Sequence, residues 1–173
     1  MNIKKGAFCI PRKFYMSHPI DYDRRIKELG LNVPPPPRYS GRLSDFVISG
    51  DLLYLSGAQP LRLGKEPYAG KLGKDFTTEE GYNMAREAAL VALSMIQEAL
   101  GTFNRVKRIV RVIGYVSSDQ DFFEQGKVIN GFSDLLLEVF GDMGRPTRLS
   151  LGVVGLSRNS PLEIELVAEI SSV

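Results

Sequence analysis

The chain has 173 residues, of which 43% are hydrophobic and 24% are charged, and its formal net charge is +2. This length and composition fit one soluble globular domain with a short extension, and the small net charge gives no reason to expect nucleic-acid binding. One cysteine excludes an internal disulfide, and one histidine excludes a histidine-rich metal site. Because no apolar run has the length of a signal peptide core or a membrane span, we expect a cytoplasmic protein.

The first 37 residues predict an N-terminal extension. Apolar side chains recur at helical spacing over residues 22–29, which predicts a short helix there. Four consecutive prolines, residues 34–37, then form a stiff connector that neither a helix nor a central strand accommodates. We therefore divide the chain into an extension, residues 1–37, and a main domain, residues 38–173. The sequence leaves open whether the extension packs on its own core or on a neighbouring subunit.

The main domain begins with two short strand patterns. Residues 45–49 and 52–56 predict two strands joined by a tight turn at Gly50-Asp51, and residues 58–76 predict a loop. A helix follows, with a capping box formed by Thr77 and Glu80.

The first long helix ends at Gly101, and a strand rich in β-branched residues is predicted over residues 106–116. We expect Asp119 or Asp121 to cap a second helix that ends at Gly141.

The last two strand patterns carry the charged residues of most interest. We expect residues 146–152 and the segment that begins at Leu162 to form a C-terminal hairpin. Arg148 and Ser150 share one face of the first strand, because strand side chains alternate. An arginine that rises from a face of small residues offers a rigid fork for a carboxylate.

This order of elements predicts an α+β fold. A mixed β-sheet would carry two helices on one face, since the strands and helices do not alternate regularly. The other face would be left bare, and burial against sister subunits would cover it.

Several motifs resemble those of the RidA (YjgF, L-PSP endoribonuclease-like) family. They are Leu55-Ser56-Gly57, Val128-Ile129-Asn130-Gly131, and Arg148 followed by Glu163 and Glu165. Two more, Gly70-Lys71-Leu72-Gly73 and Glu79-Glu80-Gly81-Tyr82, resemble a longer subgroup with an N-terminal extension. The resemblance covers roughly residues 40–173 and implies a chorismate-mutase-like fold, assembled as a homotrimer with clefts between subunits.

The resemblance also implies a chemistry. It suggests hydrolysis of reactive enamines and imines, such as 2-aminoacrylate and other 2-imino acids, to 2-keto acids and ammonia, as by a 2-iminobutanoate/2-iminopropanoate deaminase. Arg148 would bind the carboxylate of the substrate, and Glu163 would act as general base on a water molecule. The remaining residues of the predicted cleft are Ser56, Gly57, Asn130, Ser150 and Tyr39. No metal or organic cofactor is required.

Three departures from the family pattern bear on the substrate. Ser150 stands where many members have a cysteine, so thiol reactivity is absent. Leu43 stands at the position of the usual tyrosine, which Tyr39 replaces only if the loop is longer. The usual Ser-Gly-Gln is here Ser-Gly-Ala, with Gln59 shifted by one residue.

Other interpretations of these residues stay open. Arg148 and Glu163 could form an ion pair in a subunit interface. Asn130 could bond only to a neighbouring loop, and Ser56 could serve a turn. As functions, the alternatives are a non-catalytic trimer that senses a small carboxylate and, ranked last, an endoribonuclease. RNA cleavage wants a basic face and a histidine, lysine or metal at the phosphate, and His18 lies in the extension, outside the region of the resemblance.

Overall fold

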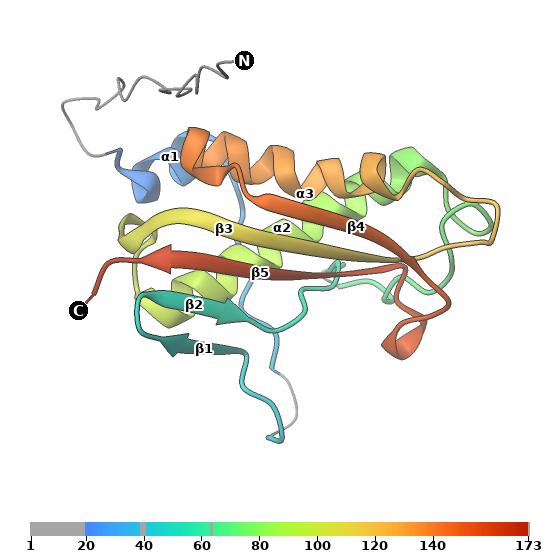
Figure 1. The fold of residues 1–173 in the computed structure, drawn as a ribbon, viewed down its shortest axis with the longest axis horizontal. Coiled ribbons are helices and arrows are strands. Elements are labelled where there is room, and N and C mark those ends of the chain that lie inside the picture. Colours follow the sequence, from blue (N-terminus) through green and yellow to red (C-terminus); the bar gives the residue numbers. More distant parts are fainter. Residues whose placement is uncertain (1–19, 39–40, 63, 173) are drawn as a thin grey trace, which may run out of the picture.

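The computed structural model describes residues 20–38, 41–62 and 64–172, and its described part is a single layer of strands covered by helices (Figure 1). The helices and strands, in chain order, are α1 Tyr22–Glu28, β1 Phe46–Ser49, β2 Leu52–Leu55, α2 Thr78–Leu100, β3 Val106–Ser117, α3 Gln125–Phe140, β4 Thr147–Val153 and β5 Leu162–Ile170. Three short 3-10 helices, η1 Phe103–Arg105, η2 Gly141–Gly144 and η3 Ser157–Asn159, occupy connections. The predicted α+β class with a mixed sheet is confirmed.

The five strands form one sheet in the order β1-β2-β5-β3-β4. All neighbouring pairs are antiparallel except β3 and β4, which are parallel. The expected C-terminal hairpin is therefore wrong, because β3 lies between β4 and β5. The physical reason is that α3 returns the chain to the starting end of β3, so that β4 runs parallel to β3 and β5 pairs with the other edge of β3.

Local sequence signals explain where α2 begins and ends. The Thr77 side chain accepts the backbone N–H of Glu80, and the Glu80 carboxylate accepts the backbone N–H of Thr77, which confirms the capping box. Gly101 ends the helix in the left-handed conformation, with φ of 73°.

The predicted cap of α3 is wrong. The backbone N–H of Asp119 donates to Leu72 and the carbonyl of Asp119 accepts from Phe122, so residues 119–122 are held in a turn. The helix consequently begins later, after Glu124, whose side chain makes no capping hydrogen bond.

Both long helices lie on one face of the sheet, with the strands in front of α2 in Figure 1. They pack closely because α3 has a glycine at the contact: a Cβ on Gly131 would lie 2.0 Å from the carbonyl oxygen of Tyr82. The short helix α1 packs on the same layer. The rings of Tyr22 and Phe140 pack edge-on, with their centroids 4.9 Å apart. The backbone N–H of Tyr22 donates to Oδ1 of Asn104 at 2.7 Å. The α1 part of the extension therefore contacts the core of its own chain.

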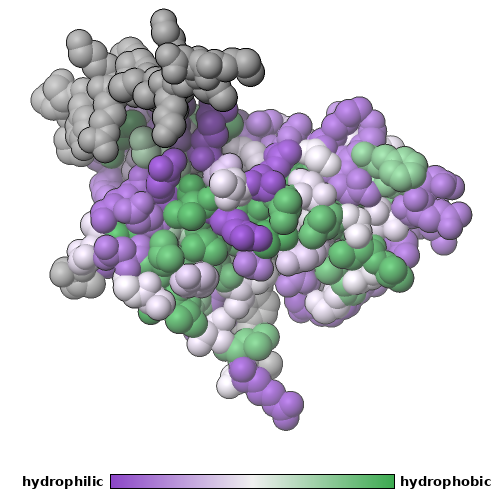
Figure 2. Space-filling view, viewed as in Figure 1, coloured by the Kyte–Doolittle hydropathy of each residue, from purple (hydrophilic) through white to green (hydrophobic). Residues whose placement is uncertain are grey.

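The other face of the sheet has no helix over it in the described part of the chain. Exposed apolar side chains of this face include Val47, Tyr54, Leu149 and Leu151. Figure 2 shows apolar residues gathered over the strands, interrupted by charged ones. No helix among the described residues is both long and apolar enough to span a bilayer.

Candidate functional site

Arg148 lies on the edge strand β4 and points to the side of the sheet that α3 covers. Its Nη1 donates to Asn130 Oδ1 and to Ser133 Oγ, both at 2.9 Å, and its Nη2 donates to the carbonyl of Gly126 at 3.4 Å. Three acceptors on successive turns of one helix therefore hold the guanidinium. Such a bonded guanidinium is oriented before any ligand arrives.

The free edge of Arg148 suits a carboxylate. Both hydrogens of Nη1 and one of Nη2 are used, while Nε–H and the second hydrogen of Nη2 donate to no described residue. Arg148 also forms no salt bridge with a described residue, and its side chain is exposed. Two parallel N–H groups of this kind match the two oxygens of a carboxylate.

Small residues surround Arg148 on its strand. The Ser150 hydroxyl is buried and has no hydrogen-bond partner among the described residues. A Cβ on Gly152 would lie 2.8 Å from Nε2 of Gln125, so a larger residue there would press on the start of α3. Ser150 and Gly152 therefore bring no bulky side chain to the face of β4 that carries Arg148.

Glu163 lies on β5 and faces the open side of the sheet. It lines a hollow of about 400 Å³ together with Ser56, Gly57, Tyr115 and others. Its Oε2 accepts from Nε2 of Gln59 at 3.0 Å. Its Oε1 lies over Gly57, where a Cβ would come within 1.9 Å of that oxygen. Gln59 therefore orients the carboxylate, and the space over Gly57 is open to it because Gly57 has no side chain.

Ser56 lines the hollow and also makes a hydrogen bond that supports the fold. Its hydroxyl donates to the carbonyl of Ser44 at 2.6 Å, which links β2 to the segment before β1. Tyr39 lies outside the described residues, and Leu43 is 66% exposed.

The two predicted catalytic residues lie on opposite faces of the sheet. Arg148 pairs with Val112 of β3, and Val112 pairs with Leu166 of β5, so these three share the helix-covered face. Glu163 pairs with Tyr115, three residues along β3 from Val112, and strand alternation places it on the other face. Within one chain the structure brings together Arg148 with Asn130, and Glu163 with Ser56 and Gly57, but not the two groups with each other.

Four residues that lie near Arg148 or Glu163 were not among the site residues predicted from the sequence. Ser133 follows Asn130 by three positions and therefore shares its helix face, which is a signal that the sequence contained. Glu165 follows Glu163 by two positions and lines the same hollow, although it was not among the predicted cleft residues. Tyr115 lines the hollow because it pairs with Glu163 across the sheet, for which no local signal exists. Gln59, noted in the sequence only as the displaced glutamine of the usual Ser-Gly-Gln, bonds Glu163 from a loop and does not line this hollow.

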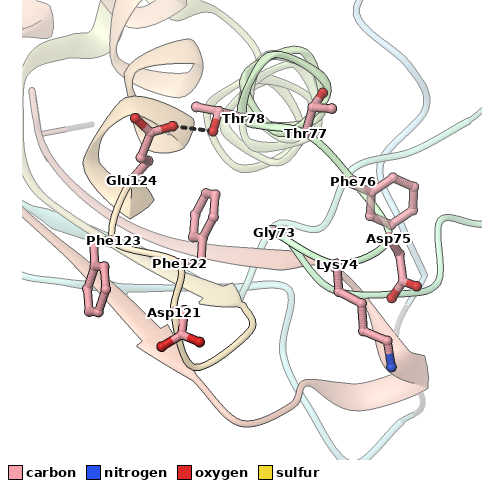
Figure 3. Close-up of a pocket in the computed structure, with 10 residues that line it drawn as sticks. All are labelled: Gly73, Lys74, Asp75, Phe76, Thr77, Thr78, Asp121, Phe122, Phe123 and Glu124. Atoms are coloured by element: carbon pink, nitrogen blue, oxygen red, sulfur yellow. Dashed lines mark hydrogen bonds between the residues drawn. The ribbon is translucent and has the colours of Figure 1, made fainter.

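A second hollow of about 570 Å³ lies between the starts of α2 and α3 (Figure 3). Thr78 Oγ1 donates to the Glu124 carboxylate across it, at 2.5 Å. The ammonium of Lys127 and this hydroxyl lower the pKa of Glu124. Its carboxylate is therefore already paired, and none of the predicted site residues lines this hollow. No set of three or more His, Cys, Asp or Glu side chains in the described ranges could hold a metal ion.

Comparison with known proteins identifies the family. The family model described as "YjgF/chorismate mutase-like, putative endoribonuclease" matches residues 23–170. The chain belongs to the YjgF (Rid) family. The YjgF-type match includes both long helices and all five strands, in agreement with the resemblance seen in the sequence.

Individual YjgF-family relatives extend this result. Protein TCP17 of Trypanosoma cruzi is 36% identical over 148 residues, which are 85% of this chain and 92% of the relative. A crystal structure from Shewanella oneidensis, named "putative endoribonuclease", is 35% identical with a TM-score of 0.83, over 87% of this chain and 100% of that chain. Escherichia coli TdcF with bound serine is 20% identical with a TM-score of 0.54, over 80% of this chain and 94% of that one, and shows the shared fold.

Proposed function

We propose that this chain is a cytoplasmic, cofactor-free deaminase that hydrolyses small 2-imino acids and their enamine tautomers to 2-keto acids and ammonia. The site lies in the clefts of a homotrimer. Arg148 of one subunit holds the substrate carboxylate, while Glu163 of the next subunit handles the proton of the attacking water.

The chemistry requires one water and one proton relay. Water oxygen bonds to the carbon of the protonated imine as Glu163 accepts a proton from the water, which gives a neutral carbinolamine. Glu163 then returns this proton to the nitrogen, the C–N bond breaks with its electron pair on nitrogen, and ammonia leaves while Glu163 accepts the hydroxyl proton as the carbonyl forms. Binding of the carboxylate by Arg148 would orient the imine carbon toward the water.

The observation that carries this proposal is the hydrogen bonding of Arg148, which fixes one edge of the guanidinium and leaves the other edge free. Its guanidinium is held from one side by Asn130, Ser133 and Gly126, and no carboxylate of the described chain uses its other edge. An oriented guanidinium whose free edge meets no described carboxylate is suited to an external carboxylate.

The placement of Arg148 and Glu163 supports an assembly in which neighbouring copies share a site. Arg148 and Glu163 face opposite sides of one sheet, so that they meet only if neighbouring copies contribute one each. The apolar open face of the sheet supplies a surface for such an assembly.

The test is ammonia release from iminopyruvate that is generated enzymatically in the assay. We expect Arg148→Ala to raise KM and lower kcat/KM by roughly 100-fold or more, because a charged hydrogen-bonded pair is lost. Arg145→Ala is the matched control, since Arg145 is an exposed arginine on the same segment that pairs with Asp142 at 3.7 Å. Equal rates for wild type and Arg148→Ala would remove Arg148 from the mechanism.

A carboxylate sensor is the second candidate. It is favoured by Ser150, which provides no thiol beside Arg148, and a protein of this fold, TdcF, has been seen with bound serine. Calorimetry with 2-ketobutyrate, paired with the ammonia assay, separates the two functions. Binding without turnover supports the sensor, and turnover excludes it.

A further inference from the structure

Gln59 connects Glu163 to an arginine on a different loop. Its Nε2 donates to Glu163 Oε2 and to Ser157 Oγ, each at 3.0 Å. Its Oε1 accepts from Nη2 of Arg158 at 3.2 Å. Gln59 and Arg158 also line a hollow of about 250 Å³, which does not include Glu163, so that Gln59 lies between this hollow and the one that holds the carboxylate.

The chemistry of these groups allows only one orientation of the Gln59 amide. A guanidinium can only donate hydrogen bonds, and an ionised carboxylate can only accept them. With Arg158 present, the amide oxygen must face the guanidinium, and the NH₂ group is turned toward Glu163. Without Arg158, the amide could rotate and the bond to Glu163 would compete with bonds to water.

The backbone of Arg158 is in an uncommon conformation. Its φ is 54°, and the next residue, Asn159, has φ of 56°. Residues other than glycine rarely adopt the left-handed region, and two in succession indicate that the loop is held by its surroundings. The conformation places the Arg158 side chain against Gln59, whereas the Asn159 side chain makes no hydrogen bond with any described residue.

We propose that Arg158 is a positioning residue that acts through Gln59. It sets the amide so that Gln59 restrains Oε2 of Glu163, which leaves Oε1, above Gly57 in the wall of the hollow, as the oxygen that meets the reactive water. This inference rests on the proposed deaminase function for its kinetic consequences, but the coupling between Arg158 and Gln59 is independent of any activity.

The experiment uses Arg158→Gly with Asn159→Gly as its matched control. Glycine suits the left-handed backbone at both positions, so both variants should fold with an unchanged or higher melting temperature. We expect Arg158→Gly to lower kcat on the order of tenfold with little change in KM, because carboxylate binding by Arg148 is untouched. Asn159→Gly should keep the wild-type kcat.

A double-mutant cycle tests whether Arg158 acts through Gln59. In a Gln59→Leu background, the further change Arg158→Gly should have no additional effect on kcat, since the intermediary is gone. If the losses of kcat in the two single variants multiply in the double variant, the proposal is overturned. A wild-type kcat in Arg158→Gly alone would overturn it as well.

Hydrogen exchange of the Gln59 side-chain amide provides a readout without substrate. We expect slow exchange in the wild type and in Asn159→Gly, and faster exchange in Arg158→Gly, as measured by NMR. Faster exchange in a protein that releases no ammonia would reject the deaminase function and keep the positioning role. Unchanged exchange in Arg158→Gly would reject the positioning role whatever the activity.

Discussion

At the scale of single residues, the absence of a side chain at Gly57 is what allows Glu163 its position. A Cβ there would lie 1.9 Å from Oε1 and 2.6 Å from Cδ of Glu163. These are contacts that real Cβ atoms do not make, so the carboxylate and an alanine cannot both occupy this space. Gly57 therefore shapes the site by sterics, in addition to its place in the wall of the hollow.

We predict that Gly57→Ala displaces the Glu163 carboxylate and lowers kcat by about 100-fold, the size of loss associated with a misplacement of about 1 Å. The melting temperature should change little, because the displaced atoms are the end of a flexible side chain. Steady-state ammonia release and thermal unfolding measure the two effects. The control is Gly155→Ala, where a Cβ has nothing within 4 Å. A Gly57→Ala enzyme with wild-type kcat would contradict the role given to Glu163.

At the scale of elements, α2 and α3 are joined by polar bonds across their contact. Arg86 of α2 donates through Nη1 and Nη2 to the two carboxylate oxygens of Glu138 on α3, each at 2.8 Å. Tyr82, one turn earlier on α2, donates to Asp134 at 2.9 Å. The Arg86 guanidinium lowers the pKa of Glu138, chiefly through its hydrogen bonds.

This pair predicts a pH dependence of stability. Because the pKa of Glu138 is lower in the folded state than in the unfolded one, the stabilisation is fully present above the ordinary value of 4.5 and is lost as the pH falls through the lowered value. The side chains remain 28% and 41% exposed, so we expect Arg86→Met to cost only about 0.2–1 kcal/mol near neutral pH.

Urea unfolding at about pH 7 and again below about pH 3 checks the sign, because the difference between Arg86→Met and wild type should shrink at the lower pH. Arg145→Met removes a longer, more exposed pair and serves as the comparison. A difference that grows as the pH falls would show that the pair does not act as described.

Across the whole molecule, the open face of the sheet is the surface on which the proposed assembly depends. Its apolar side chains have no cover within the described chain, while α1, α2 and α3 all lie on the other side (Figure 1). Exposed apolar side chains gathered on one face of a sheet are a feature of protein interfaces.

We predict a particle in solution with three times the 19.2 kDa mass of one chain. Leu149 is 48% exposed on the open face, and Leu149→Glu should produce monomers and abolish ammonia release, because each site needs two subunits. Leu29→Glu, at a leucine 40% exposed on the helix side, should keep the mass of the wild type. Sedimentation velocity measures both, and an active monomer would exclude the shared site.

The amino-acid sequence alone was enough to recognise the family, the α+β class and the elements whose ends carry local signals. Capping residues, glycine stops and the period of apolar side chains are local, so that α2 could be placed from Thr77 to Gly101, and β1 and β2 from the Gly50-Asp51 turn. The later start of α3 could not be predicted, because a contact with Leu72, distant in the chain, holds Asp119 in a turn.

Only the tertiary structure decided which residues meet. Strand order depends on how α3 returns the chain, and local periodicity carries no information about it, which is why β3 and not β4 pairs with β5. The same pairing places Arg148 and Glu163 on opposite faces and brings Gln59 and Arg158 together from loops 99 positions apart. Side-chain type and spacing can identify a charged residue as a candidate for the site, but long-range packing sets which residues it contacts.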